Sequence, residues 1–295
     1  MAAEIIDGKA VAKKWHTEVS MAAARLKAEK GIVPGLGVIL VGDNPASVSY
    51  VTAKERACES DGLMSREIRM AADSTEADVI KEINKLNADP EIHGILVQLP
   101  LPKQIDEKKV IEAILPEKDV DGFTDVNVGR MSIGEECFLP CTPHGIIQLL
   151  IECGVDTDGK HAVVIGRSNI VGKPVASLLM RKAPGGNATV TVCHTGTKNL
   201  AYFTKQADIL IVASGRPMTV TGDMIKEGAV VIDVGVNRIP DEKAVRGYRL
   251  VGDVDFASAS QVASKLTPVP GGVGPLTIAM LMKNTILAAE RAAAR

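Results

Sequence analysis

The amino-acid sequence predicts an α/β protein of two domains, and three observations lead to this fold class. Apolar runs of five to eight residues alternate with longer helical patterns, as in repeated β-α units. The runs are mostly continuous Val, Ile and Leu, which is typical of parallel strands buried on both faces. The chain has 295 residues, and at roughly 150 residues per domain this length predicts two domains.

The elements follow from these runs in chain order. The strands are predicted over Leu36–Val41, Gly94–Leu99, Ala162–Ile165, Ala188–Cys193, Ile209–Ala213 and Ala229–Val234. The helices are predicted over Val11–Lys30, Ala46–Ser60, Glu76–Ala88, Glu107–Ile114, Gly145–Glu152, Val171–Arg181 and Leu276–Ala294. Asn44-Pro45 predicts a capped helix start, since Asn caps well and Pro suits the first helical position. The proline-rich stretch Pro140–Pro143 is the predicted domain boundary.

The composition argues against several classes of protein. There are 34 Lys and Arg against 36 Asp and Glu, a formal net charge of −2, and only eight aromatic residues, so nucleic acid is a poor match. No apolar run approaches the roughly 18–20 residues that span a bilayer. Residues 1–14 include Glu4 and Asp7 and lack the apolar centre of a signal peptide. We therefore expect a cytoplasmic protein that binds neither nucleic acid nor membrane.

Five cysteines are present, and they are scattered as Cys58, Cys137, Cys141, Cys153 and Cys193. An odd, scattered set is not a disulfide framework. Neither the group of Cys137, Cys141 and His144 nor the pair Cys193-His194 has the paired short spacings of a zinc site. We expect reduced thiols and no metal.

A glycine turn follows the strand at 162–165. Gly166 and Gly172 flank Arg167 and Ser168, and a helix follows. Such a turn lets backbone N–H groups reach a phosphate at the positive end of the helix. The match to the dinucleotide fingerprint is incomplete, because Ser168 replaces the middle glycine and Gly172 falls one residue late. The pattern favours a nucleotide site, and a plain tight turn is the alternative.

The charges around this turn indicate which nucleotide it would bind. NAD-selective sites place an acidic residue about 20 residues after the turn, yet no Asp or Glu occurs between Gly159 and Ala207. Seven Lys and Arg lie in the same window, Arg167 among them. A guanidinium can grip a 2′-phosphate that a carboxylate would repel. The sequence therefore predicts NADP rather than NAD.

A second group of polar residues lies in the N-terminal half. Ser47, Tyr50, Lys54 and Cys58 are spaced by three or four residues and share one helix face. A solvated face with a stray tyrosine would give the same spacing. Tyr-x-x-x-Lys also occurs in short-chain dehydrogenases, but there it follows the nucleotide turn, whereas Tyr50 precedes Gly166.

Two further polar residues point to the same edge of the predicted sheet. Gln98 lies near the end of the strand at 94–99, and Asp121 lies in the turn-rich loop 116–123. Ligands bind at the carboxyl ends of parallel strands. A glutamine in an apolar strand also needs a buried partner, which Lys54 would supply. These residues predict an active site.

Eight longer motifs are spread over nearly the whole chain: DGKA at 7–10, VGD at 41–43, SVSY at 47–50 with Lys54, HGILVQLPLP at 93–102, PEKDVDG at 116–122, PCTP at 140–143, VIGRSNIVGKP at 164–174 and TPVPGGVGPLT at 267–277. With these motifs the sequence resembles the bifunctional methylenetetrahydrofolate dehydrogenase/methenyltetrahydrofolate cyclohydrolase family over nearly its whole length. The late Gly172 fits this family's turn well.

The resemblance implies roles for individual residues. Lys54 would be the catalytic lysine, partnered by Gln98, with Tyr50 against the folate and Asp121 holding the pterin. The implied folate contacts also include Pro270, Gly271 and Gly272. The implied cofactor contacts are Gly166, Arg167, Ser168, Gly172, His194, Thr195, Val236 and Thr277. Thr195 stands where the family often has Ser, and the role of His144, where some members carry Lys, stays open.

The implied function is NADP-dependent oxidation of 5,10-methylenetetrahydrofolate, then hydrolysis to 10-formyltetrahydrofolate, in one-carbon metabolism that feeds purine biosynthesis. The implied assembly is a homodimer. Residues 1–145 would form a folate domain on which the helix of 276–295 packs, residues 146–275 a Rossmann domain, with the active-site cleft between them. A dehydrogenase lacking the second activity and an inactive nucleotide-sensing or scaffold protein are the alternatives.

Overall fold

The computed structural model of the chain describes residues 2–244 and 247–294. The contacts of the chain divide it into two compact units. The three-stranded unit comprises Lys13–Cys141 and the residues from Ile278 onward, and the six-stranded unit comprises the residues up to Ala12 and Thr142–Thr277. Among the described residues, no helix has both the length and the apolar character needed to span a membrane.

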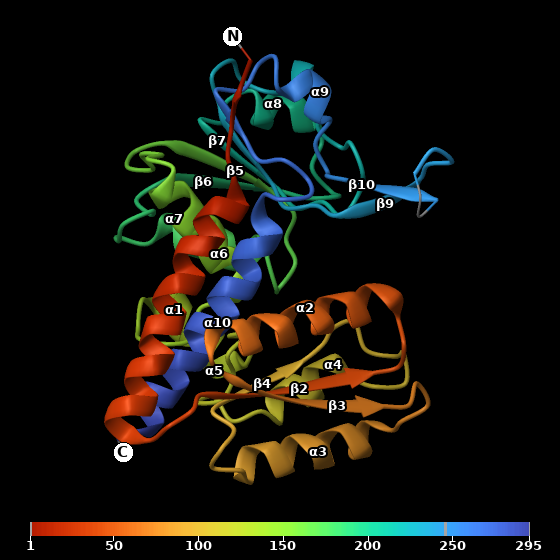
Figure 1. The fold of residues 1–295 in the computed structure, drawn as a ribbon. Coiled ribbons are helices and arrows are strands. Elements are labelled where there is room, and N and C mark those ends of the chain that lie inside the picture. Colours follow the sequence, from red (N-terminus) through yellow and green to blue (C-terminus); the bar gives the residue numbers. More distant parts are fainter. Residues whose placement is uncertain (1, 245–246, 295) are drawn as a thin grey trace. The chain divides into compact units, whose positions relative to one another are not determined.

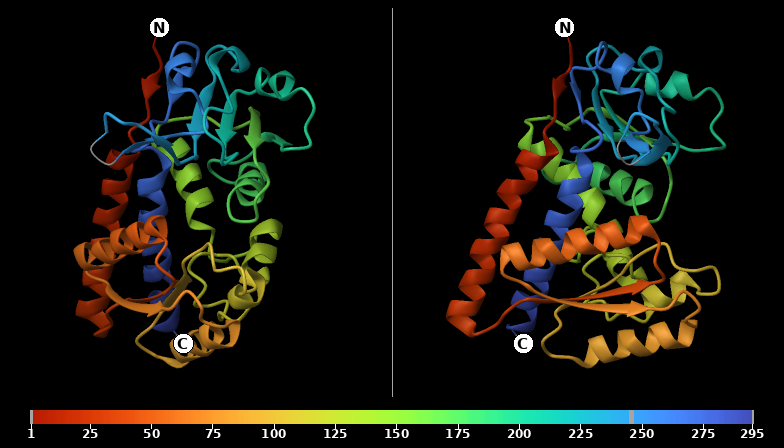
Figure 2. Two further views of the ribbon diagram at one scale, coloured as in Figure 1. Left: turned by 90° about the vertical axis from the view of Figure 1, so that its right-hand side faces the viewer. Right: turned by 45° about the vertical axis from the view of Figure 1, so that its right-hand side comes forward.

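A parallel sheet forms the centre of the three-stranded unit. Its strands lie in the order β3 (Met64–Met70), β2 (Gly35–Val41), β4 (Gly94–Val97). Helices α2 (Pro45–Asp61) and α3 (Glu76–Ala88) cover opposite faces of this sheet, as Figure 1 and both turned views in Figure 2 show. The central strand β2 is buried along its whole length, which agrees with its unbroken apolar sequence.

The other helices of this unit are α4 (Glu107–Glu112), α5 (Asp125–Ile133) and most of the two long helices α1 (Gly8–Lys30) and α10 (Val273–Ala292). Within the unit α1 and α10 contact each other through polar side chains. Arg25 lies 3.0 Å from Glu290 in an ion pair, and the Lys283 ammonium lies 4.0 Å from the centre of the Trp15 ring. The C-terminal helix is thus part of the three-stranded unit.

The start of α2 confirms the cap predicted from the sequence. The Asn44 carboxamide oxygen accepts hydrogen bonds from the backbone N–H groups of Ala46 and Ser47, at 2.9 and 3.3 Å, and Pro45 is the first helical residue. The helix ends at Gly62, which has a φ of 79° that favours glycine. Both ends of the helix that carries Lys54 are therefore fixed by local sequence.

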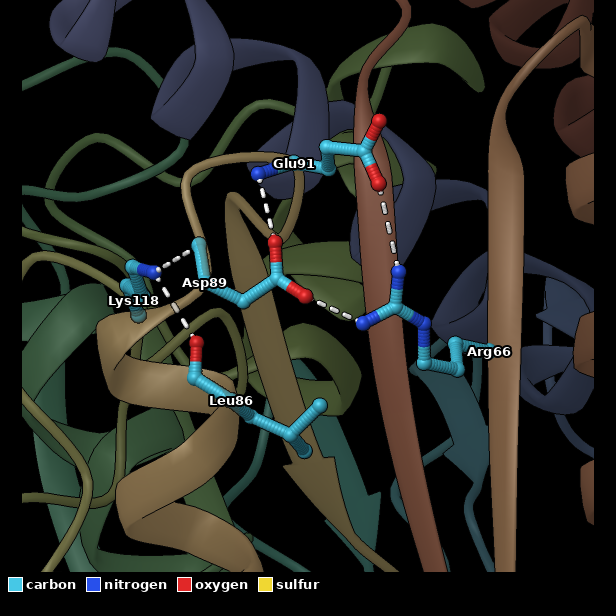
Figure 3. Close-up of polar contacts among 5 residues, drawn as sticks. All are labelled: Arg66, Leu86, Asp89, Glu91 and Lys118. Carbon is cyan, nitrogen blue, oxygen red and sulfur yellow. Dashed lines mark hydrogen bonds and ion pairs between the residues drawn. The ribbon is translucent and has the colours of Figure 1, made fainter.

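A polar network anchors the loop that precedes α5. The Lys118 ammonium donates to the backbone carbonyls of Leu86 and Asp89, at 3.0 and 2.8 Å, and so adds a charged donor to two carbonyls at the end of α3 (Figure 3). The Asp89 carboxylate in turn binds Arg66 of β3, which also lies 3.4 Å from Glu91. These contacts tie the beginning of the 116–122 loop to the sheet.

A larger parallel sheet forms the centre of the six-stranded unit. Its strand order is β1 (Glu4–Ile5), β11 (Lys265–Leu266), β8 (Val230–Asp233), β7 (Ile209–Val212), β5 (His161–Ile165), β6 (Thr189–Cys193). The helices of this part of the chain are α6 (Cys141–Glu152), α7 (Gly172–Met180), α8 (Leu200–Thr204), α9 (Phe256–Ala259) and a 3-10 turn at Gly222–Met224. The antiparallel strands β9 (Asn237–Pro240) and β10 (Tyr248–Val251) form a separate ribbon.

The predicted α/β class, with a parallel sheet in each domain, is confirmed, and every predicted strand and helix is present. Most boundaries are right to within two residues, but the starts of α1, α10 and α6 were predicted three, three and four residues too late. The strand predicted over Gly94–Leu99 ends at Val97, because Pro100 has no N–H group with which to continue the ladder. The helix predicted to begin at Gly145 begins at Cys141, because a proline such as Pro143 is tolerated in a first helical turn.

Several short or polar elements were not predicted. Strand β3 has the sequence MSREIRM and lies partly buried at the edge of its sheet. Its charged residues interrupt the apolar pattern by which a strand is recognised. Strands β1 and β11 have two residues each, and they pair with one another across most of the chain. Two-residue runs carry no periodic signal, so only the assembled sheet reveals them.

Candidate active site

Lys54 and Gln98 form a hydrogen-bonded pair at one end of the three-stranded sheet. Lys54 lies on α2 and is 7% exposed, and its Nζ donates to Oε1 of Gln98 at 3.0 Å. The Gln98 amide nitrogen donates to the Leu99 carbonyl at 2.7 Å. This second bond fixes the orientation of the amide, so an acceptor faces the lysine. The pairing of Lys54 with Gln98 that was expected from the sequence is present.

Burial changes the proton affinity of the lysine. Removal from water lowers the pKa of Lys54 below its ordinary value, because burial disfavours the charged ammonium. Negative charge at Asp121 opposes this shift. The same physics raises the pKa of the Asp121 carboxyl, and the charge of Lys54 opposes that shift. The lysine amine is thus brought closer to proton exchange at neutral pH than a surface lysine is.

The helix face that carries Lys54 is mostly buried. Ser47 and Cys58 lie on it and are 4% and 0% exposed. Tyr50, one turn before the lysine, is 41% exposed and lies at the margin of this face. A solvated face was the alternative interpretation, and it is wrong for Lys54 and its buried neighbours. The exposed Tyr50 ring offers an aromatic surface beside a buried amine.

Asp121 and its neighbour Asp119 have different surroundings. Asp121 is partly buried, and its charged neighbours are Lys54 and Asp119. The Asp119 carboxylate accepts hydrogen bonds from the backbone N–H groups of Phe123 and Thr124, at 3.1 and 2.8 Å, and from the Asn127 side chain at 2.9 Å. Asp119 therefore fixes the residues just before α5, whose N-cap is Thr124, whereas the Asp121 carboxylate contacts the Cys141 thiol as a hydrogen-bond partner.

The glycine turn in the six-stranded unit connects β5 to α7. Gly166 has a φ of +122°, and a Cβ atom there would lie 2.2 Å from the Ala213 carbonyl oxygen. A Cβ atom on Gly172 would lie 2.2 Å from the Gly166 carbonyl oxygen. Ser168 Oγ accepts hydrogen bonds from the N–H groups of Val171 and Gly172, at 3.2 and 3.3 Å. The serine in place of the middle glycine thus closes the turn.

The neighbouring turn follows β6, which pairs in parallel with β5. The His194 N–H donates to Thr197 Oγ1 at 2.9 Å, and the Gly196 N–H donates to His194 Nδ1 at 3.1 Å. Thr195 is exposed, as is Arg167 in the first turn. Because the two strands are parallel and adjacent, both turns lie at the same edge of the sheet. An exposed guanidinium, an exposed hydroxyl and a glycine turn therefore lie at this edge, and a phosphate site requires such groups.

The other sequence-predicted residues also lie in the six-stranded unit. Val236 follows β8 and is 48% exposed. Thr277 shares a 2.9 Å hydrogen bond with Thr142. In the segment Pro270–Gly272, Gly271 has a φ of +110°, and Gly272 packs so closely that a Cβ on Gly8 would lie 1.8 Å from its carbonyl oxygen. This segment is held where only glycine fits.

The thiols and acids form no further centre in the described part of the chain. No disulfide joins the cysteines of residues 2–244 and 247–294, and no group of three or more His, Cys, Asp or Glu there could hold a metal ion. Burial raises the pKa of Cys58 to about 12 and raises the pKa of Cys141 as well. Both thiols therefore stay protonated and weakly nucleophilic.

Two family models cover most of the chain. Residues 6–121 match the catalytic domain of tetrahydrofolate dehydrogenase/cyclohydrolase, and residues 140–293 match the NAD(P)-binding domain of the same family. The chain belongs to the tetrahydrofolate dehydrogenase/cyclohydrolase family. The resemblance seen in the sequence motifs is confirmed, and the glycine turn lies within the match to the NAD(P)-binding domain.

Individual relatives agree over the full length. The Bifunctional protein FolD of Moorella thermoacetica is 59% identical over 291 residues, which cover 99% of this chain and 100% of the relative. The crystal structure of bifunctional FolD from Campylobacter jejuni superposes with a TM-score of 0.92 at 48% identity, covering 98% of this chain and 99% of that one. These relatives carry the bifunctional name, so the single-activity alternative is not favoured, and the chain is a bifunctional dehydrogenase and cyclohydrolase.

One solved relative was determined with a nucleotide. The Trypanosoma brucei methylenetetrahydrofolate dehydrogenase-cyclohydrolase, complexed with NADP and an inhibitor, superposes with a TM-score of 0.94 at 42% identity, covering 99% of this chain and 98% of that one.

Sequence reasoning missed two residues that the structure places beside Asp121. Cys141 and Asn284 lie far from it in the chain, and no local pattern signals such contacts.

Proposed function

We propose that this family member oxidises 5,10-methylenetetrahydrofolate with NADP and hydrolyses the 5,10-methenyl product to 10-formyltetrahydrofolate, with Lys54 as the acid-base group of the second step. The observation that carries the proposal is the buried Lys54 amine, bound to Gln98 at 3.0 Å and with a pKa lowered by burial. A buried lysine with a lowered pKa is able to act as a general base.

The hydrolytic step needs proton transfer. Water attacks the methenyl carbon, and the neutral Lys54 amine accepts a proton from that water. The resulting ammonium then donates a proton to the folate nitrogen that leaves the carbon. Gln98 holds Nζ through its acceptor oxygen, and so directs the amine while leaving its lone pair for the water.

The oxidative step makes no such demand. The lone pairs of the folate nitrogens stabilise the cation that forms as hydride leaves the methylene carbon, so alignment is the protein's main contribution. Bound NADP supplies the hydride acceptor. The difference between the two steps predicts that loss of the Lys54 amine separates the two activities.

Asp121 and Tyr50 are the proposed folate contacts of the three-stranded unit. The pterin carries amino and ring N–H donors, and a carboxylate offers matching acceptors in a charge-assisted pair. Asp119 binds the N–H groups that lead into α5, so the Asp121 carboxylate is not needed there and is proposed to face the pterin. The exposed ring of Tyr50 would lie against the folate. Pro270, Gly271 and Gly272 are further proposed folate contacts.

The residues around the glycine turn fit NADP. Arg167 is exposed beside the turn closed by Ser168, and no acid occurs between Gly159 and Ala207 to repel a 2′-phosphate. The proposed contacts are Gly166, Arg167, Ser168, Gly172, His194, Thr195, Val236 and Thr277. The NADP complex of the T. brucei relative supports this assignment.

The arrangement of domains and the assembly of the chain stay predictions. We propose a folate domain of residues 1–145 with the helix of 276–295 and a Rossmann domain of 146–275. A homodimer in the cytoplasm, with no nucleic-acid partner, is proposed from the resemblance and the composition. The bacterial relatives support an enzyme of one-carbon metabolism.

An assay of the purified chain tests the proposed function. Methylenetetrahydrofolate is supplied with NADP or with NAD, and the reduced nucleotide, the methenyl intermediate and 10-formyltetrahydrofolate are followed together. We expect reduction of NADP in preference to NAD, with 10-formyltetrahydrofolate as the end product. Reduction without that end product would leave only a dehydrogenase, and a preference for NAD would refute the cofactor assignment.

A further inference from the structure

Asn284 is a buried polar residue on α10 whose side chain reaches two distant segments of the three-stranded unit. It is 3% exposed. Its Nδ2 atom donates to the Val120 carbonyl at 2.8 Å and to the Leu139 carbonyl at 3.0 Å. It also lies 3.8 Å from Cys141 Sγ. Burying an amide among apolar residues such as Leu281 and Ala288 is unfavourable unless its hydrogen bonds are made, so these bonds account for an asparagine at this position.

The Val120 carbonyl belongs to the peptide bond that leads directly into Asp121. Two donors meet at this oxygen, since Cys141 Sγ donates to it at 3.4 Å in addition to the Asn284 amide. A carbonyl oxygen has two lone pairs, so both can be accepted. Because the orientation of this peptide sets the direction of the Asp121 side chain, the two donors fix where the carboxylate lies.

The other anchors of the loop act at other points. Lys118 ties the beginning of the loop to the end of α3, as Figure 3 shows. Asp119 ties the middle of the loop to the first turn of α5. Gly122 has a φ of +69° and lies against the backbone of Phe138. With these three anchors in place the loop stays folded without Asn284, but the peptide before Asp121 loses its strongest donor.

We propose that Asn284 is a positioning residue for folate recognition, which holds the Val120–Asp121 peptide so that the Asp121 carboxylate faces the pterin. The inference rests on the proposed role of Asp121. The amide acts through geometry and brings no charge to the neighbourhood of Lys54 and Asp121. Its loss therefore affects the binding of folate and spares the binding of NADP.

The test compares Asn284→Leu with the wild type and with a matched control. Leucine keeps the size and the burial of the side chain but removes the donor. We expect the KM for methylenetetrahydrofolate to rise about 10- to 100-fold, the range of a lost charge-assisted hydrogen bond, while the KM for NADP changes less than about twofold. Thr285→Val is the control, because Thr285 is equally buried on α10 and its hydroxyl bonds only to the Leu281 carbonyl of its own helix.

A double-variant cycle distinguishes positioning from a general structural effect. If Asn284 acts through Asp121, the folate KM of Asn284→Leu combined with Asp121→Asn equals that of Asp121→Asn alone. Additive losses, equal rises of both KM values, or an unchanged folate KM in Asn284→Leu would overturn the inference. A normal folate KM in Asp121→Asn would refute the proposed role of Asp121 itself, and the inference with it. If Asn284→Leu does not fold, Asn284→Ala, which also removes the donor and adds no bulk, is put through the same cycle.

Discussion

The candidate catalytic residues of the three-stranded unit and the candidate nucleotide site of the six-stranded unit have opposite environments. In the three-stranded unit the important groups are side chains withdrawn from water: Lys54 is buried, and burial shifts the pKa values of both Lys54 and Asp121. In the six-stranded unit the turns after β5 and β6 present backbone groups and exposed side chains such as Arg167 and Thr195. Proton transfer requires a group whose pKa differs from that of a surface residue. Binding a phosphate requires permanent charge and available hydrogen-bond donors.

This contrast has a consequence for substitutions. A change at Lys54 should alter one chemical step and leave the nucleotide site as it is. A change at Arg167 should alter the choice of nucleotide and leave the proton chemistry as it is. Substitutions in each unit therefore test whether the two functions are separate.

The largest effect is expected for Lys54→Met. Methionine keeps much of the packing of the lysine stem but removes the amine, and general acid-base help is typically worth about 10²- to 10⁴-fold. We expect cyclohydrolase activity to fall by this factor while dehydrogenase activity remains measurable and methenyltetrahydrofolate accumulates. Both activities are measured on one purified sample, with a thermal melt as a control for folding. A parallel fall of both through a raised folate KM would mean that Lys54 only binds substrate.

A smaller effect is expected for Arg167→Ala. A hydrogen bond to a charged group contributes roughly 1.5 to 3 kcal/mol, so we expect the Kd for NADP to rise about 10- to 150-fold with little change in the Kd for NAD. Lys173→Ala is the matched control, because this exposed lysine at the start of α7 bonds to Asn169 in the turn at 2.7 Å. Equal rises of the Kd values for NADP and NAD in Arg167→Ala would mean that Arg167 does not bind the 2′-phosphate.

The smallest effect concerns a buried acid of the six-stranded unit. Asp233 is 4% exposed, and burial raises its pKa to about 6, although the N–H groups of Val254, Asp253 and Gly235 oppose the shift. A raised pKa means that the folded chain holds a proton that the unfolded chain has released. Its contribution to stability is therefore complete below about pH 4 and is lost as the pH rises through 6, by up to about 3 kcal/mol.

The comparison of wild type with Asp233→Asn measures this contribution. The melting temperature of the wild type should gain on that of the variant as the pH falls from 7 to 5. Glu227→Gln, at an exposed position, should show no such trend. A constant difference between wild type and Asp233→Asn across this range would mean that Asp233 titrates as an ordinary carboxyl.

Much of the fold could be predicted because its signals are local. The unbroken apolar sequence of β2 and the Asn44-Pro45 start of α2 each determine their structure within a few residues. The charged edge strand β3 and the two-residue strands β1 and β11 could not be predicted, because only their partners in the sheet make them strands.

The residues of the candidate site also differ in whether a local sequence pattern reveals them. Lys54 and Gln98 were found because a lysine on a helix face and a glutamine at a strand end are unusual enough to need a partner. Asn284 was not found, since it contacts Val120 across 164 residues of sequence and looks like any polar residue of a helix. Sequence patterns thus found the proposed ligand-binding groups and missed the residue that is proposed to position one of them.

Burial lowers the pKa of Lys54 and so enables it to act as a general base. A titration of this side chain is the most direct test. Lysine labelled with ¹³C at the ε carbon is followed by NMR from neutral to alkaline pH, and Lys54→Met assigns the Lys54 signal by its loss. The account predicts a midpoint below the ordinary lysine value of about 10.4, with cyclohydrolase activity rising through the same midpoint as the amine loses its proton. A Lys54 midpoint at or above the ordinary value, with activity that does not follow it, would contradict the account.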